Sequence, residues 1–133
     1  MKRARDRRME RFLRLPTKEE WTSELENGWD GPDGSSASTD NIGGIVIGKT
    51  SRSFYSSELP ANLHDWYYRL GRRKGLHRRF RKAADKSYRN GCLEKVSILV
   101  GWAGWKARMR CRTRYQGLRL FGWRAWKYQP PKK

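Results

Sequence analysis

The chain has 133 residues, with 31 lysines and arginines against 13 carboxylates and a net charge of +18. This length predicts one domain with a modest core, and two cysteines, Cys92 and Cys111, are too few for a disulfide framework and lack the neighbours of a zinc site. The longest apolar run, residues 98–105, is too short to span a bilayer, and no apolar segment of a secretory signal peptide follows the arginine-rich N-terminus.

Residues 1–26 are predicted to form a charged arm outside the main domain, which we expect over residues 27–133. Residues 1–15 have helical propensity, and Thr17 with Glu20 fits the capping box of a second short helix. The first helix carries a weak apolar stripe that is too small to fold alone: Met9, Phe12, Leu13 and Leu15. We therefore expect an arm that is solvated or bound to a partner.

Residues 27–60 are predicted to form a loop and hairpin region, because they are rich in Gly, Ser and Asp. The segment 27–34 has the composition of tight turns. The β-branched run 42–49 predicts one strand of a small hairpin that reaches residues 53–55. The segment 27–34 is either an ordinary surface loop or a loop whose backbone carbonyls face a hard cation, although it lacks the spacing of an EF-hand.

Residues 61–92 are predicted to form two helices. The first begins at Pro60 and ends near Gly71, and the second begins near Arg78. The second helix places apolar residues along one stripe, with Asp85 at its edge: Phe80, Ala84, Tyr88 and Cys92. Antiparallel packing of the two helices would bring Asp85 toward the first.

His64 and two aspartates are the candidates for chemistry in this half of the chain. From residue 61 onward there are 21 basic residues but only three carboxylates, and two of these are Asp65 and Asp85. His64 and Tyr68 share a helix face at i and i+4, whereas Asp65 points about a quarter turn away. A histidine acts as a general base when a carboxylate fixes its tautomer and orientation, a role that suits Asp85. Asp65 then remains as a ligand for a hard divalent ion.

Residues 93–133 combine tryptophans with arginines and lysines. Trp102 with Trp105, and Trp123 with Trp126, have helical i, i+3 spacing. We favour a pair of amphipathic helices whose aromatic side chains close the core while arginines extend outward. The alternatives are an interfacial face for an anionic phospholipid surface and a groove in which nucleic-acid bases stack. No motif for sequence-specific nucleic-acid binding is present.

The histidine segment resembles the phospholipase A2 motif, His-Asp-x-x-Tyr followed by Ala-Asp on an antiparallel helix. Here it consists of His64, Asp65 and Tyr68, then Ala84 and Asp85, over about residues 57–92. The 21-residue step from His64 to Asp85 is similar to the compact phospholipase A2 domains in capsid proteins of some small DNA viruses. The segment also looks like small bacteriophage proteins of largely unassigned function, which carry the same core before a Trp-rich basic tail.

This resemblance implies roles for individual residues. His64 would be the general base, Asp85 the residue that orients it, Tyr68 a hydrogen-bonding support and Asp65 a calcium ligand. The implied calcium loop comprises Gly28, Asp30, Gly31 and Gly34. The chain departs from the family here, because the family's loop usually lies closer to the helix, and because Pro60 and Tyr67 stand where secreted members have cysteines.

These patterns predict a mostly α-helical small domain with two antiparallel helices that bear the motif, a Gly/Asp-rich loop with a short hairpin, and a basic Trp-rich helical C-terminal segment. The first functional hypothesis is a phage-encoded, calcium-dependent hydrolase of a phospholipid ester. The second is a phage structural protein that keeps the fold and binds other virion proteins, and the third is a non-specific nucleic-acid binder. The expected location is the virion or the cytoplasm of an infected host cell.

Overall fold

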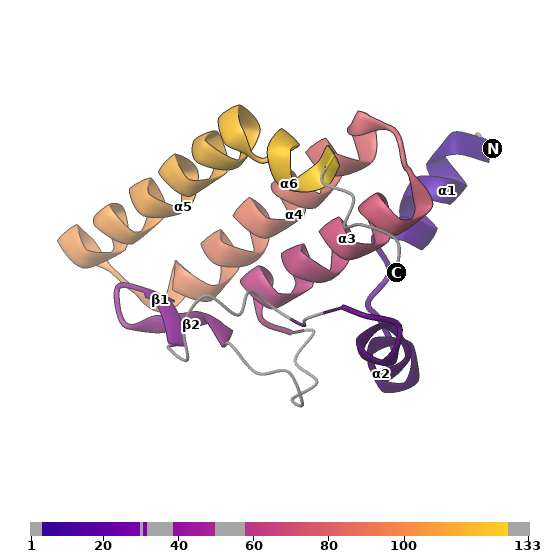
Figure 1. Ribbon diagram of the computed structural model, residues 1–133. Coiled ribbons are helices and arrows are strands. Elements are labelled where there is room, and N and C mark those ends of the chain that lie inside the picture. Colours follow the sequence, from indigo (N-terminus) through magenta and orange to yellow (C-terminus); the bar gives the residue numbers. More distant parts are fainter. Residues whose placement is uncertain (1–3, 30, 32–38, 50–57, 128–133) are drawn as a thin grey trace.

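The computed structural model describes residues 4–29, 31, 39–49 and 58–127. Within them the chain is mostly helical with one two-stranded antiparallel hairpin, as the sequence predicts (Figure 1). The elements are α1 (Ala4–Phe12), α2 (Lys18–Glu26), β1 (Thr39–Ile42), β2 (Ile45–Lys49), α3 (Pro60–Lys74), α4 (Arg78–Lys95), a short 3-10 turn (Val96–Ile98), α5 (Gly101–Phe121) and α6 (Trp123–Lys127).

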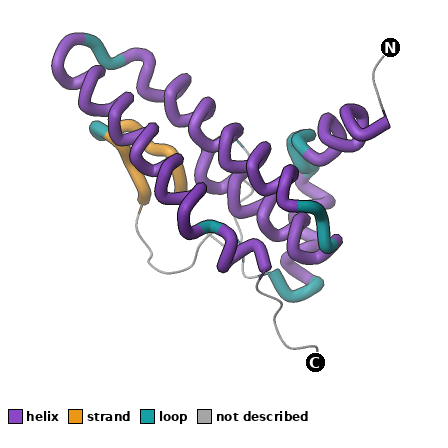
Figure 2. Tube along the Cα trace, turned by 90° about the horizontal axis from the view of Figure 1, so that it is seen from above, coloured by secondary structure: helices purple, strands orange, loops and turns teal. Residues whose placement is uncertain are grey.

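Helices α3, α4 and α5 form the centre of the molecule. Each packs antiparallel to the next along the chain, so α4 lies between α3 and α5 (Figures 1 and 2). The hairpin contacts α3, α4 and α5, at the end of this three-helix group that lies away from α1 (Figure 2). This arrangement confirms the predicted antiparallel pairing of the two helices that carry the histidine motif.

Helix α3 is longer than predicted, because it continues through Gly71 to Lys74. Gly75 ends it instead, in the left-handed conformation at φ 62°, which glycine adopts at little cost. Gly71 lies inside the helix under the indole of Trp126, and a Cβ at this position would overlap that ring. The glycine near the predicted helix end is therefore a packing residue and not a cap.

The hairpin is tighter than predicted. Its turn lies inside the apolar run at Gly43 and Gly44, whose φ values of 59° and 84° suit a two-residue hairpin turn. Ile42 and Ile47 are fully buried against the apolar side of α4 and α5. The part of the predicted hairpin at residues 53–55 lies outside the described residues.

The described part of segment 1–26 is packed on the domain and is not a solvated arm. Phe12 and Trp21 are 7% and 1% exposed and join the core that contains Trp66. Buried Glu24 accepts hydrogen bonds from Arg69 at 3.0 Å and from Arg73 at 2.8 Å, which ties α2 to α3. The expectation of a separate arm failed because its weak apolar stripe pairs with aromatic residues distant in sequence. The capping box of Thr17 is confirmed.

The C-terminal helices close the core with one tryptophan. Trp126 of α6 is 7% exposed, whereas Trp102 and Trp105 of α5 and Trp123 of α6 lie in solvent. Small residues make the buried contact of α5 instead: Gly104, Ala107 and Cys111. The prediction that the aromatic residues of this segment close the core is therefore wrong for three of the four tryptophans. Within the described residues, none of the helices has the length and apolar character needed to cross a membrane.

Candidate functional site

His64 and Asp85 meet across the interface between α3 and α4. His64 Nε2 lies 2.8 Å from Asp85 Oδ1. The imidazole is 8% exposed and the carboxylate is fully buried. Because a buried carboxylate is costly unless it is paired and hydrogen-bonded, this contact is a specific feature of the fold. The helical pattern predicts this approach, and the structure brings the two residues together.

Aromatic side chains hold the imidazole on two sides. The Tyr68 ring lies 4.3 Å from the His64 ring between centroids, and the Tyr88 ring lies 5.3 Å from it. The Tyr68 hydroxyl donates to Asp85 Oδ1 at 2.7 Å, the same oxygen that contacts His64. Burial raises the pKa of Tyr68, and the hydrogen bond to Asp85 raises it further, so this phenol keeps its proton.

Two arginines contact the other oxygen of Asp85. Arg119 Nη1 of α5 donates to Oδ2 at 2.8 Å, and Arg81 Nη1 lies 3.5 Å from the same atom. Sequence reasoning missed both residues. The i, i+4 spacing of Arg81 and Asp85 was a usable signal, because such residues share a helix face. Arg119 had none, since it is 34 residues away on another helix.

The ionisation of Asp85 decides the tautomer of His64. Burial by itself raises the pKa of Asp85, but the hydrogen bonds from His64 and Tyr68, together with Arg119, hold it below its ordinary value. An ionised carboxylate only accepts hydrogen bonds, so His64 Nε2 must carry a proton. In the neutral imidazole the lone pair is then on Nδ1. In this tautomer Nδ1 is the ring nitrogen that can accept a proton.

The end of α5 and the start of α6 cover the Asp85 side of this network. Arg81 Nη1 also donates to the carbonyl of Leu118 at 3.0 Å. Gly122 follows at a point where an added Cβ would meet the Tyr68 hydroxyl oxygen. The Trp126 ring stands edge-on to Tyr68 at 5.1 Å between centroids. The basic C-terminal segment thus belongs to the site.

Only part of the implied calcium loop can be placed. Asp30 and Gly34 lie outside the described residues. Gly28 is exposed with φ 99°, and Gly31 is buried with φ 85°. Trp29 between them packs against Trp66 at 5.6 Å between ring centroids. The turn therefore lies against α3 beside the helical turn that carries Asp65, which is half-buried.

The calcium site that the resemblance implies at this turn stays a prediction. The described residues contain no group of three His, Cys, Asp or Glu side chains that could hold a metal ion. A site here would combine the carboxylate of Asp65 with backbone carbonyls, which are oxygen ligands of the kind calcium prefers. The carbonyl of Asn27 already accepts a hydrogen bond from Arg69 at 3.1 Å, so the later carbonyls of the turn are the candidates.

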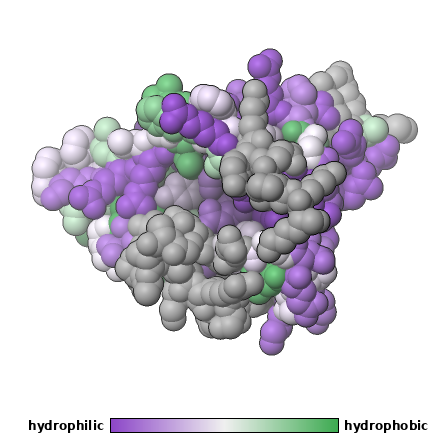
Figure 3. Space-filling model, viewed as in Figure 1, coloured by the Kyte–Doolittle hydropathy of each residue, from purple (hydrophilic) through white to green (hydrophobic). Residues whose placement is uncertain are grey.

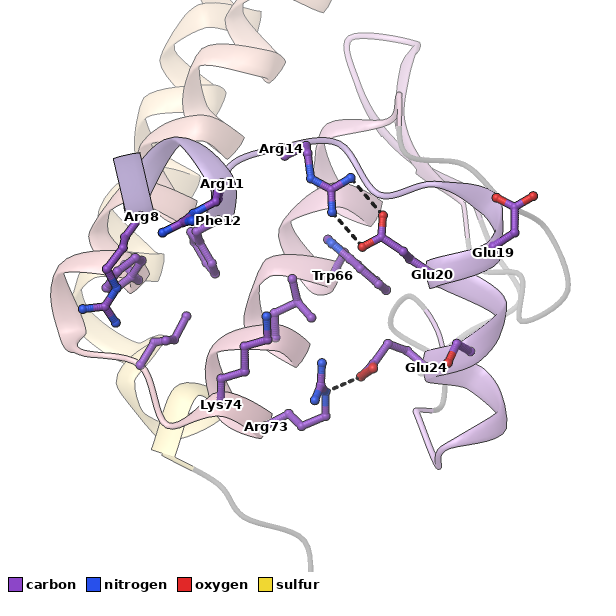
Figure 4. Close-up of a pocket in the computed structure, with 14 residues that line it drawn as sticks. Arg8, Arg11, Phe12, Arg14, Glu19, Glu20, Glu24, Trp66, Arg73 and Lys74 are labelled. Carbon is purple, nitrogen blue, oxygen red and sulfur yellow. Dashed lines mark hydrogen bonds and ion pairs between the residues drawn. The ribbon is translucent and has the colours of Figure 1, made fainter. Parts of the chain in front are cut away.

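A cavity of about 730 Å³ lies on the face of α3 opposite to His64, between α1, α2 and α3 (Figure 4). Its described lining contains no histidine, and four of its charged side chains form two ion pairs. Arg14 makes two hydrogen bonds to Glu20, at 3.0 and 2.8 Å, and Arg73 pairs with Glu24. The cavity is therefore separate from the histidine site. The Arg14–Glu20 pair joins the segment after α1 to α2, and the Arg73–Glu24 pair joins α2 to α3.

Comparison of the chain with models of protein families, with curated proteins and with solved structures gave no match. The function proposed below is supported by the geometry of His64, Tyr68 and Asp85 and by the sequence motif that they form.

Proposed function

We propose that this chain is a phage-encoded, phospholipase A2-like hydrolase that cleaves a phospholipid ester in a calcium-dependent reaction with His64 as general base. The observation that carries the proposal is the 2.8 Å contact between His64 Nε2 and buried Asp85 Oδ1, with the Tyr68 hydroxyl on the same oxygen. The spacing of these residues agrees with the compact viral form of the motif. Its substrate would be a phospholipid in an anionic membrane surface. The protein would act from the virion or inside an infected host cell.

His64 would take a proton from the attacking water at Nδ1. Asp85 would keep the other ring proton on Nε2 and stabilise the imidazolium that forms, since the carboxylate lies 2.8 Å from that nitrogen. Tyr68 would fix the carboxylate through its short hydrogen bond. His64 would then return the proton to the leaving alcohol oxygen of the ester, so that the water oxygen ends on the acyl carbon and the proton balance closes.

Calcium would be held by Asp65 with backbone carbonyls of the turn at Gly28 and Gly31, and by Asp30 and Gly34 if the implied loop is complete. When bound, such an ion supplies positive charge for a substrate phosphate and for the ester carbonyl. The support for this part is the packing of Trp29 on Trp66, which holds the described start of the loop beside α3.

Hydrolysis of mixed phosphatidylglycerol and phosphatidylcholine vesicles tests the proposal. His64→Ala should lower the rate by about 100-fold or more, because a positioned general base contributes about that much. His77→Ala is the matched control, since His77 is an exposed cap residue at the start of α4. Chelation of calcium and Asp65→Asn should each abolish the activity. Equal background rates for the wild type and His64→Ala would overturn the enzyme proposal.

A second candidate is a non-catalytic virion protein that keeps this fold and binds other virion proteins. The observation in its favour is that Asp85 pairs with Arg81 and Arg119 as well as with His64, as in a network that stabilises a helix interface. This candidate predicts co-purification with particles, no ester cleavage and no effect of a chelator.

A third candidate is non-specific binding of nucleic acid through α5. The stacked rings of Trp102 and Trp105, 5.0 Å apart between centroids, resemble a platform for bases. This candidate predicts an affinity for single-stranded RNA or DNA that falls steeply with salt and does not change in His64→Ala.

A further inference from the structure

The outward face of α5 carries large apolar side chains. The buried side of the helix follows Gly104, Ala107 and Cys111, which are spaced at i, i+3 and i+7. Trp102 and Trp105 lie on the opposite side and are 70% and 49% exposed. A surface helix normally exposes its polar side to water. The N-terminal part of α5 instead exposes large aromatic side chains and buries small residues.

Further exposed apolar side chains lie before and after the two tryptophans along the chain. Ile98 and Val100 in the turn before α5 are 73% and 80% exposed. By helical spacing Met109 and Leu120 lie on the same side of α5 as Trp102, with polar Thr113 and Gln116 between them. Figure 3 shows hydrophobic atoms beside hydrophilic ones near the C-terminal end of α5. We define the outer α5 surface by six exposed residues: Ile98, Val100, Trp102, Trp105, Met109 and Leu120.

Positive charge borders this surface on both sides. By helical spacing, Lys106 and Arg110 lie along one flank and Arg108 and Arg112 along the other, and all four are exposed. Lys106 Nζ lies 6.0 Å from the centre of the Trp102 ring. The sequence has no Asp or Glu after Glu94, so no negative side chain offsets this charge in the last 39 residues.

We propose that the outer α5 surface docks on an anionic phospholipid bilayer, with α5 parallel to the membrane plane. Tryptophans favour the headgroup level, aliphatic side chains enter the acyl boundary, and flanking lysines and arginines contact lipid phosphates. A nucleic acid would match the tryptophans and the cations but would leave Ile98, Val100 and Leu120 exposed to water. The aliphatic residues therefore favour the bilayer.

This inference deepens the proposed phospholipid hydrolysis and rests on it for its biological meaning, although binding and cleavage are measured separately. The buried side of α5 sends Arg119 to Asp85, while the opposite side forms the outer α5 surface. One helix would thus contact both the histidine site and the membrane.

Co-sedimentation of the full chain with vesicles tests the inference, in the presence of a chelator so that no lipid is cleaved. The probes are phosphatidylcholine vesicles with and without about one third phosphatidylglycerol, the anionic fraction being large enough for polybasic attraction. The wild type should bind the anionic vesicles. Trp102→Ser with Trp105→Ser should bind them at least about tenfold more weakly, because affinity scales with the apolar area buried in the interface.

Trp123→Ser is the matched control, because Trp123 is an exposed tryptophan outside the outer α5 surface. It should bind the anionic vesicles as the wild type does, because the outer α5 surface is unchanged in this variant. Circular dichroism should show the same helicity in all variants. Equal binding by the double variant and the wild type, or binding of RNA but not of vesicles, would overturn the inference.

The same preparations separate this inference from the proposed function. If His64→Ala binds vesicles as the wild type does and neither protein cleaves ester, membrane docking stands and hydrolysis falls. If the wild type cleaves a dispersed short-chain phospholipid but does not sediment with anionic vesicles, hydrolysis stands and docking falls. The double tryptophan variant should still cleave the dispersed substrate at the wild-type rate.

Discussion

The interface of α3 and α4 and the outer face of α5 depart from the usual distribution of side chains in opposite directions. The first buries ionisable groups, with His64, Arg81 and Asp85 each less than 9% exposed. The second exposes apolar groups, with Trp102 70% and Leu120 64% exposed. A buried polar cluster and an exposed apolar patch are both more informative than an ordinary core or surface.

The comparison teaches where evidence for function lies in this chain. A buried charge destabilises the fold unless partner groups compensate it. Changes in the Asp85 network should therefore affect stability as well as chemistry. Exposed apolar side chains contribute little to the folded state, so those on α5 should matter only when a partner is present. The two regions should therefore respond differently to mutation.

The largest expected effect on stability is in Asp85→Asn. The change removes the charge that compensates Arg81 and Arg119, and should lower the free energy of unfolding by about 3–5 kcal/mol, the usual loss when one partner of a buried ion pair is removed. Urea denaturation measures it. Asp65→Asn, at a half-buried position, is the comparison, and an equal loss in the two variants would contradict the importance of burial.

Acid should remove the same stabilisation gradually in the wild type. The pKa of Asp85 is lowered in the folded state, so below its ordinary value of about 4 the unfolded chain binds the proton more readily. The contribution is therefore complete above that pH and is lost as the pH falls through the folded pKa. Unfolding measured from pH 7 to pH 3 should show a smaller difference between the wild type and Asp85→Asn at the acid end.

Gly71→Ala should have the next largest effect. The new methyl group would overlap the indole of Trp126, and overpacking of this kind costs about 1–3 kcal/mol. Gly117→Ala on α5 is the matched control, because no atom lies within 4 Å of its added Cβ. That control should be stabilised by up to about 1 kcal/mol through helix propensity. Thermal unfolding should show a lower melting temperature for Gly71→Ala and a higher one for Gly117→Ala than for the wild type.

The smallest effect on stability is expected for Trp102→Ser combined with Trp105→Ser. Exposed positions usually change the free energy of unfolding by no more than about 0.5 kcal/mol each. Urea denaturation of this double variant without vesicles should therefore give a midpoint close to that of the wild type. A large loss would mean that the stacked indoles support the core, and the contrast between the two regions would then fail.

Local patterns in the sequence were sufficient for the helices and for the approach of Asp85 to His64. Helical spacing places His64 and Tyr68 on one face, and two antiparallel helices leave little freedom for the carboxylate. The role of Gly71 was not predictable in this way, because a glycine near a helix end has the same signal whether it caps the helix or lies under an indole. Only the long-range contact with Trp126 distinguishes the two.

The two ends of the chain were harder to predict for a related reason. Phe12 looked like a member of a weak stripe, since its ring partner Tyr67 is more than fifty residues away. Trp21 likewise stacks on Trp66, which is more than forty residues away. In the sequence of α5 the tryptophans are the most conspicuous hydrophobic residues. The residues that the helix buries are instead Gly104, Ala107 and Cys111. Small residues allow the close approach of two helices and leave almost no hydrophobic pattern to detect.

The reach of Arg119 to Asp85 has a consequence for the order in which the protein is assembled. During synthesis from the N-terminus, α3 and α4 leave the ribosome before Arg119 does, so the newly paired helices hold a carboxylate that lacks its closest cation. The packing of α5 then supplies that cation and the cover above Tyr68 together. Completion of α5 should therefore stabilise the pairing of α3 and α4. A nascent chain that ends before residue 119 should remain sensitive to protease.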